Sequence, residues 1–182
     1  YRWNTDAGIS QDDEAVALWQ EQFKSVWIEA KAVNMAEEKW TQWGKIFYYN
    51  EKENWWSRAG VPENMPVWEP GGPDSEMFWD FGEHLGLHEK WLSERKASWK
   101  YKPADEHCHP ACDCGRFLEF ANNVFMQFKK TDTWFEELAH KNIDFGGGLE
   151  RIVVALNDDP DVFLGDVFDS IRAKIEELSG KK

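Results

Sequence analysis

The clearest pattern of hydrophobic and polar positions lies at Arg116–Phe128, where apolar and aromatic residues dominate. Glu119, Asn122 and Gln127 interrupt the apolar residues, as expected for a strand with one dry face and one polar face. The segment therefore predicts a strong strand. Its polar residues indicate either a functional face or a half-buried face that a loop covers, and the pattern leaves both interpretations open.

Other regions show helical or strand-like periodicity. Amphipathic or charged helices are predicted from an N-cap at Ser10 to about Phe23, over Met35–Trp43, over about His88–Ser98 and over Gly165–Leu178. Strands are predicted over Val26–Val33, Lys45–Tyr49 and Met77–Trp79. The segment from Pro62 to Pro73 is rich in proline and glycine, so we expect an irregular and potentially functional loop there.

The stretch Asn142–Ile152 combines an acid, Asp144, with three glycines at 146–148 and a helical run that carries Arg151. Glycines let the backbone bend and let a ligand approach closely. The helix start offers free N–H groups to an anion, and arginine adds a planar fork that suits phosphate. The pattern predicts an anion-binding turn, although a purely structural turn explains it too. Asp144 suits either a helix cap or a partner for a ligand ammonium group.

Composition limits the classes of protein that fit. The 182 residues suffice for one domain, and 12 Trp with 12 Phe predict large aromatic clusters, some of them at a pocket or an interface. The net charge of −13 argues against free-standing, non-specific nucleic-acid binding. No membrane-spanning run and no signal pattern are visible, so a cytoplasmic setting without membrane contact is expected.

All three cysteines lie between residues 108 and 114, beside two histidines. Thiolate and imidazole are the ligands that zinc prefers, so Cys108, Cys112, Cys114 and His109 are a candidate zinc site. The spacing differs from the common pair of cysteines separated by two residues. Three reduced thiols at the edge of a pocket are the alternative.

Five segments, in this order, resemble the catalytic domain of the alanyl-tRNA synthetase family, which belongs to the class II aminoacyl-tRNA synthetases. They are Asp12–Ala15 with Trp19, Glu53–Trp56, Glu69–Glu76 with Asp80, Phe117–Phe128 and Asn142–Ile152. The chain departs from the family pattern at Gly71 and Asp74, where cysteine is frequent, and at Ala121, which replaces a tryptophan. The Cys/His loop is additional.

The resemblance implies an α+β fold, namely the class II synthetase catalytic core with part of its antiparallel sheet flanked by helices. Residues 1–182 would form one partial catalytic domain, with the third class motif at residues 142–155. The first two motifs, one of which supplies an arginine for the ATP α-phosphate, would precede the acidic helix and are missing here. The chain is therefore expected to need the N-terminal half of the catalytic domain and to be inactive, or nearly so, alone.

The resemblance also implies a reaction: activation of alanine by ATP and Mg²⁺ to alanyl-adenylate, followed by transfer to tRNA(Ala). Asp144 would hold the alanine ammonium group, Trp56 would wall the side-chain pocket and Asn122 would hydrogen-bond the amino acid. The implied nucleotide-binding residues are Gly146, Gly148, Arg151 on adenine and the terminal phosphate, and Glu119 on Mg²⁺. A paralogue that binds an adenylate without charging tRNA, and a zinc-loop interaction protein, are the alternatives.

Overall fold

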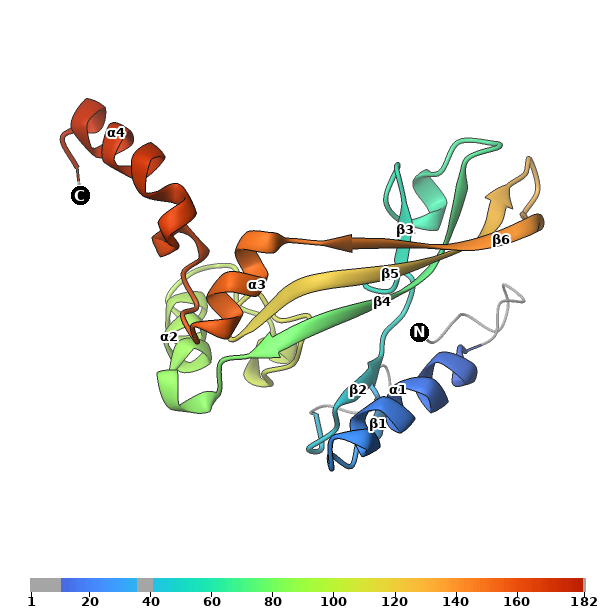
Figure 1. Cartoon of the computed structure of the whole chain (residues 1–182), viewed down its shortest axis with the longest axis horizontal. Helices are drawn as coiled ribbons and strands as arrows, with labels where there is room; N and C mark the ends of the chain where they lie inside the picture. The colour runs from blue at the N-terminus through green and yellow to red at the C-terminus, as the bar shows by residue number, and fades with distance from the viewer. Residues whose placement is uncertain (1–10, 36–40, 182) are drawn as a thin grey trace.

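The computed structural model describes residues 11–35 and 41–181. Its centre is an antiparallel sheet in the order β3-β4-β5-β6, formed by Trp55–Ser57, Pro70–Asp80, Phe117–Lys130 and Phe135–Gly147. Helices α2 (Leu87–Lys96) and α3 (Leu149–Leu156) lie at one end of the sheet, where β4 ends and β5 begins (Figure 1). The architecture is the α+β fold that the sequence predicts.

A small unit lies beside the sheet and contains α1 (Asp13–Ser25), β1 (Ala32–Asn34) and β2 (Ile46–Tyr48) (Figure 1). The two short strands pair in parallel. Helix α1 is capped by Asp12, whose carboxylate accepts a hydrogen bond from the backbone N–H of Ala15 at 2.8 Å. The predicted cap, Ser10, lies outside the described residues.

Two predictions in this unit are wrong or only partly testable. The predicted strand Val26–Val33 is wrong over most of its length, because Trp27 adopts φ 64° after the helix and pairing begins only at Ala32. The predicted helix Met35–Trp43 falls partly on residues outside the described ranges. At its end, Gln42 and Trp43 have φ 47° and 60°, which a right-handed helix excludes.

The predicted proline- and glycine-rich loop is also wrong in its last part, because Pro70–Pro73 open the long strand β4. Glycine makes this possible: a Cβ at Gly72 would collide with the backbone carbonyl of Phe125 on β5. The pairing of β4 with β5 shifts register between Gly71 and Asp74. The close approach of two backbones therefore converts an apparent loop into a strand.

Strand β5 confirms the strong strand of the sequence analysis and lies between β4 and β6. Its pairing with β6 sets Asn122 opposite Gly146 and Val124 opposite Asp144. Strand β6 continues through Gly147, and α3 starts at Leu149. Gly146–Gly148 are therefore not a tight turn, and none of the three has a positive φ.

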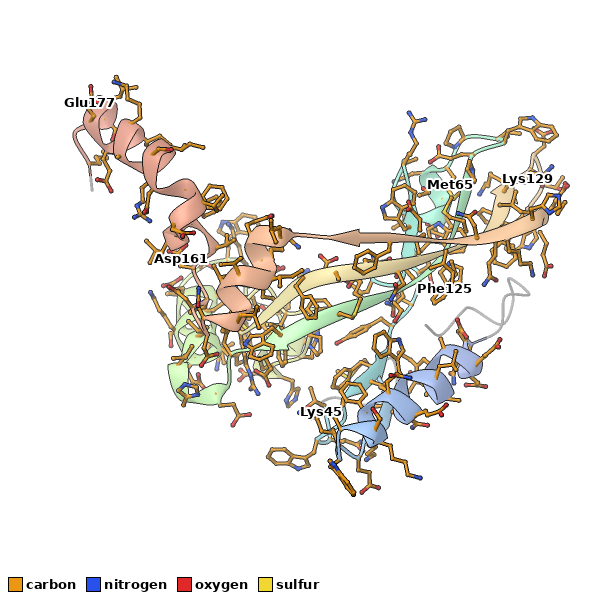
Figure 2. The ribbon with its side chains drawn as sticks, viewed as in Figure 1. Lys45, Met65, Phe125, Lys129, Asp161 and Glu177 are labelled. Carbon is orange, nitrogen blue, oxygen red and sulfur yellow. The ribbon has the colours of Figure 1, made fainter. Side chains whose placement is uncertain are left out.

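The best-packed cluster joins Trp55, Met65 and Phe128, with Phe135 against it. Figure 2 shows Met65 at the end of the sheet where β3 lies. Phe81, only 1% exposed, is the most deeply buried large side chain at the other end, just after β4. These two anchors hold both ends of the long β4–β5 pair.

The remaining elements are short or peripheral. Single turns of 3-10 helix lie at Pro62–Asn64, Glu83–Leu85, Pro103–Glu106, Val162–Leu164 and Asp166–Phe168. Helix α4 (Asp169–Ser179) extends away from the sheet and leaves its apolar side chains, such as Ile171 and Ile175, exposed (Figure 1). Among the described residues, no helix has the length and apolar character needed to span a membrane.

Candidate functional site

A cavity of about 670 Å³ lies over the sheet and reaches the start of α3. All four strands of the sheet contribute to its wall. It brings together every residue that the sequence analysis assigned to substrate or nucleotide: Trp56, Glu119, Asn122, Asp144, Gly146, Gly148 and Arg151. Segments separated by almost 100 positions in the chain thus meet at one cavity.

Asn122 belongs to a buried polar network that is centred on Asp74 at the wall of this cavity. Its Nδ2 donates to Oδ2 of Asp74 at 2.9 Å, and Nδ2 of Asn54 donates to the other oxygen of the same carboxylate at 3.4 Å. The Oδ1 atom of Asn122 is buried and has no hydrogen-bond partner among the described residues. A buried acceptor without a donor is costly, so this atom is suited to a ligand that brings a donor.

Asp144 lies on β6, opposite Val124 on β5, and lines the same cavity. The interpretation of Asp144 as a helix cap is wrong, because α3 is capped by Gly148 and has no side-chain cap hydrogen bond. Asp144 therefore makes no cap hydrogen bond to α3 and lines the cavity instead. Trp56, which is 38% exposed, adds an apolar wall.

Asp74 and Glu76 also line the cavity, although the sequence analysis assigns neither to the site, because they lie between the predicted loop and the predicted strand Met77–Trp79. Burial raises the pKa of Asp74 to about 6, against the opposing effect of the amide donors of Asn122 and Asn54. Burial and the charges of Asp74, Glu119 and Glu53 raise the pKa of Glu76 to about 8. The sequence feature that indicates both acids is their spacing of two residues, which places the two side chains on one face of a strand.

Arg151 and Glu119 are joined at the end of the cavity next to α3. The Nη1 atom of Arg151 donates to the backbone carbonyl of Glu119 at 2.9 Å and to its carboxylate Oε2 at 3.1 Å. Within the described chain, the other guanidinium nitrogens make no hydrogen bond. The guanidinium is thus held in place while most of its donors stay available to an anion.

Among the three glycines, Gly146 provides clearance rather than a bend. A Cβ at Gly146 would meet no atom within 4 Å, so the backbone there borders open cavity. Gly148 donates its N–H to the carbonyl of Phe120 at 3.0 Å, which fixes the end of β6 against β5. A ligand can therefore lie directly on the backbone of residues 146–147.

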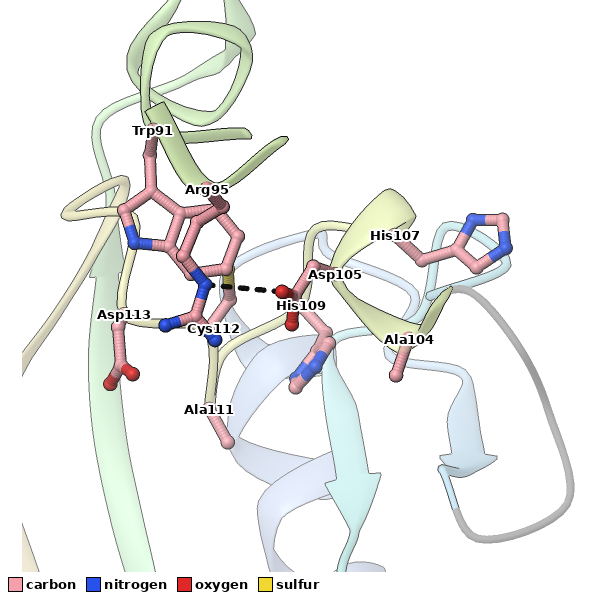
Figure 3. Close-up of a pocket in the computed structure, with 9 residues that line it drawn as sticks. All are labelled: Trp91, Arg95, Ala104, Asp105, His107, His109, Ala111, Cys112 and Asp113. Carbon is pink, nitrogen blue, oxygen red and sulfur yellow. Dashed lines mark hydrogen bonds and ion pairs between the residues drawn. The ribbon is translucent and has the colours of Figure 1, made fainter. Parts of the chain in front are cut away.

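The thiols form a second group, next to α2 and away from the large cavity. The ligand atoms of His88, Cys108, Cys112 and Cys114 all lie within 4.8 Å of one another. His109, the imidazole predicted from sequence, is not in this group: its Nδ1 lies 3.0 Å from the hydroxyl of Tyr49. Figure 3 shows His109 and Cys112 on the small adjacent pocket whose wall includes the Arg95–Asp105 ion pair of 3.1 Å.

Comparison with known proteins identifies similar sequences over the whole chain. The family model for class II tRNA synthetases (A) matches residues 8–182. The alanine–tRNA ligase of Treponema denticola is 31% identical over 184 aligned residues, which cover 100% of this chain and 23% of that protein. The alanine–tRNA ligase of Petrotoga mobilis is 33% identical, covering 94% of this chain and 15% of that protein. The chain thus spans about a quarter or less of the length of these relatives.

Proposed function

Because this chain belongs to the class II (A) tRNA synthetase family, we propose that its large cavity binds alanine and ATP and forms alanyl-adenylate. In this reaction an oxygen of the alanine carboxylate attacks the α-phosphorus of ATP, and the bond from that phosphorus to pyrophosphate breaks. No covalent intermediate with the protein is required. The contribution of the cavity is positioning and charge stabilisation.

The proposed amino-acid end is formed by Asp144, Asn122 and Trp56. The alanine ammonium group pairs with the Asp144 carboxylate and donates to Oδ1 of Asn122, the buried acceptor that has no partner within the described chain. Trp56 limits the space beside the α-carbon, which favours a methyl group over larger side chains. A pocket of this kind discriminates weakly against glycine, since one methylene is worth about 1–3 kcal/mol.

The proposed nucleotide end is formed by Arg151, Glu119 and the glycines. Arg151, held through Nη1 by Glu119, stacks on adenine and reaches the terminal phosphate. Gly146 and Gly148 leave room for the adenylate along the backbone. The carboxylates of Glu119, Asp74 and Glu76 are hard oxygen donors, which is the chemistry that Mg²⁺ selects, and Mg²⁺ would neutralise phosphate charge there.

Transfer of the alanyl group to tRNA(Ala) completes the proposed function and requires more than this cavity. No arginine of the described chain other than Arg151 lines the cavity, so the guanidinium for the ATP α-phosphate is assigned to another segment of the protein. Strand β6 is an exposed edge of the sheet. An edge strand of 13 residues can pair with a further strand, and we assign that position to the N-terminal half of the catalytic domain.

The observation that carries the proposal is the meeting of Trp56, Asn122, Asp144 and Arg151 around one cavity. The test is a calorimetric titration of the chain with alanyl-sulfamoyl-adenosine, a stable mimic of alanyl-adenylate, compared with the leucyl compound. We expect the alanyl compound to bind at least tenfold more tightly. Equal affinity for both, or no binding of either, would contradict the assignment. An aminoacylation assay of the protein in its natural form then separates a tRNA ligase from an adenylate-binding paralogue.

A further inference from the structure

Three thiols and one imidazole converge beside α2 although their residues are separated by up to 26 positions in the sequence. His88 lies in the first turn of α2, while Cys108, Cys112 and Cys114 lie on the loop that precedes β5. We infer that these four residues bind one Zn²⁺ ion in a closed, structural site. This inference is independent of the proposed reaction, because none of the four lines the large cavity.

Two distances between opposite pairs of the four ligand atoms match the edges of a zinc tetrahedron. Bonds of about 2.3 Å to sulfur and about 2.0–2.1 Å to nitrogen set two sulfurs about 3.8 Å apart and a sulfur and a nitrogen about 3.6 Å apart. The Sγ atoms of Cys108 and Cys114 are 3.6 Å apart, and Sγ of Cys112 is 3.6 Å from Nδ1 of His88. A disulfide between Cys108 and Cys114 would need about 2.05 Å, so the cysteines are free.

Burial of His88 supplies the second argument. Its side chain belongs to a residue that is only 9% exposed, and its Nε2 has no hydrogen-bond partner within the described chain. The one contact of its Nδ1 is with a thiol, which is a weak partner. A bond from Nδ1 to a metal ion would replace this weak contact and compensate the loss of water at that nitrogen.

The residue set also specifies the type of site. Cys114 is 8% exposed, and four protein ligands leave no position for water or substrate. A four-ligand set of three cysteines and one histidine is a common structural zinc set, while catalytic zinc keeps an open position. Soft thiolates also disfavour Mg²⁺ and Ca²⁺, which prefer oxygen.

The site has a mechanical consequence for β5. Just after Cys114, Arg116 forms a two-pronged ion pair with Asp80 at 2.7 and 2.9 Å and a third contact with Glu83 at 3.0 Å. These contacts tie the start of β5 to the end of β4. A zinc ion at the cluster adds a covalent-like link from the same loop to α2, so the metal would fix the point from which β5 enters the sheet.

The test measures zinc in the purified chain by inductively coupled plasma mass spectrometry, with His88→Ala and His109→Ala compared. We expect one zinc per wild-type chain, loss of most of that zinc in His88→Ala, and wild-type zinc in His109→Ala. His107→Ala, which removes an exposed imidazole from the same loop, is the matched control and keeps its zinc. Wild-type chain without zinc, or loss in His109→Ala with retention in His88→Ala, would overturn the assignment.

Since His88→Ala could fail to fold, His88→Cys provides a second measurement. Four thiolates form an equally suitable zinc set, so this variant keeps one metal ion. Replacement of the metal by Co²⁺ should give sulfur-to-cobalt charge-transfer absorption, with a shift between wild type and His88→Cys because one nitrogen ligand becomes sulfur. An identical spectrum in both proteins, or tightly bound iron in place of zinc, would contradict the three-cysteine, one-histidine zinc site.

Discussion

Nδ2 of Asn122 on β5 donates a hydrogen bond of 2.9 Å to Oδ2 of Asp74 on the neighbouring strand β4. With Nδ2 bound in this way, the other polar atom of the Asn122 amide, Oδ1, is buried and has no hydrogen-bond partner among the described residues. The same bond favours the charged form of Asp74, whose pKa burial raises to about 6. One side chain therefore links the ionisation of a buried acid to the proposed acceptor for the ligand ammonium group.

Replacing Asn122 with alanine tests this link. The substitution removes a donor to the Asp74 carboxylate, so the pKa of Asp74 should rise further above its usual range. It also removes the acceptor for the ligand ammonium group, so alanine affinity should fall about 10- to 100-fold, since a hydrogen bond to a charged group contributes about 1.5–3 kcal/mol. Carbon-13 NMR titration of the Asp74 carboxyl group and calorimetry measure the two effects. Asn123→Ala, the adjacent residue outside the cavity lining, is the control; an unchanged pKa of Asp74 in Asn122→Ala would contradict the argument.

Glu76→Gln tests the buried acidic cluster through the pH dependence of stability. Burial and neighbouring carboxylates raise the pKa of Glu76 to about 8, so the folded chain holds a proton that the unfolded chain loses near its ordinary pKa of about 4.3. The contribution of Glu76 to the free energy of unfolding should therefore decrease as the pH rises from about 4 to about 8. Glutamine removes this contribution, so the variant should gain stability relative to wild type as the pH rises. Urea denaturation at several pH values measures the difference, and a constant difference across this range would refute the prediction.

Two glycine substitutions separate a structural from a binding role. Gly72→Ala forces a Cβ against the carbonyl of Phe125, so we expect destabilisation by about 1–3 kcal/mol or more and a lower melting temperature. Gly146→Ala meets no atom within 4 Å, so its folding should be preserved. Its methyl group would occupy the cavity, however, and should weaken binding of the adenylate mimic about tenfold. Thermal melts and calorimetry on both variants test this contrast, which fails if Gly146→Ala binds like wild type.

Arg151→Lys tests the nucleotide end of the cavity. Lysine keeps the positive charge but lacks the planar fork, so it cannot hold Glu119 and present further donors to a phosphate at once. We expect the Kd for ATP to rise about tenfold. Stability should change by less than about 1 kcal/mol, since the Arg151–Glu119 pair is partly exposed. Fluorescence titration with ATP measures the affinity, and Arg172→Lys on α4 is the control; equal ATP affinity in all three proteins would remove Arg151 from the proposed site.

The elements that the sequence predicted well are those with a strong local signal. Strand β5 follows from its own alternation, and the residues at the cavity follow from motifs whose order in the chain matches a family. Helix α1 follows from its amphipathic pattern and from acids in its first turn, and α2 follows from a run of charged residues. For the strand and the helices, the information lies within about a dozen neighbouring residues.

The errors arise where tertiary contacts decide the local structure. The start of β4 was predicted to be a loop because its prolines and glycines lack strand propensity, while the structure uses Gly72 for a close backbone approach to β5. His88 was missed as a ligand because it lies 20 positions before Cys108 in the sequence, and only folding brings α2 to the loop. Three glycines predicted a turn, but β6 continues through Gly147, and Gly146 borders open cavity. Residues that become neighbours only in the folded chain produce no periodic pattern in a single sequence.

The central claim is that Asp144 holds the ammonium group of alanine during adenylate formation. The direct measurement is alanine-dependent exchange of pyrophosphate into ATP by the protein in its natural form, with wild type, Asp144→Asn and the exposed control Asp132→Asn compared. Loss of a charge-assisted contact worth about 1.5–3 kcal/mol predicts that kcat/KM for alanine falls about 10- to 100-fold in Asp144→Asn and stays unchanged in Asp132→Asn. Wild-type exchange by Asp144→Asn would contradict the account.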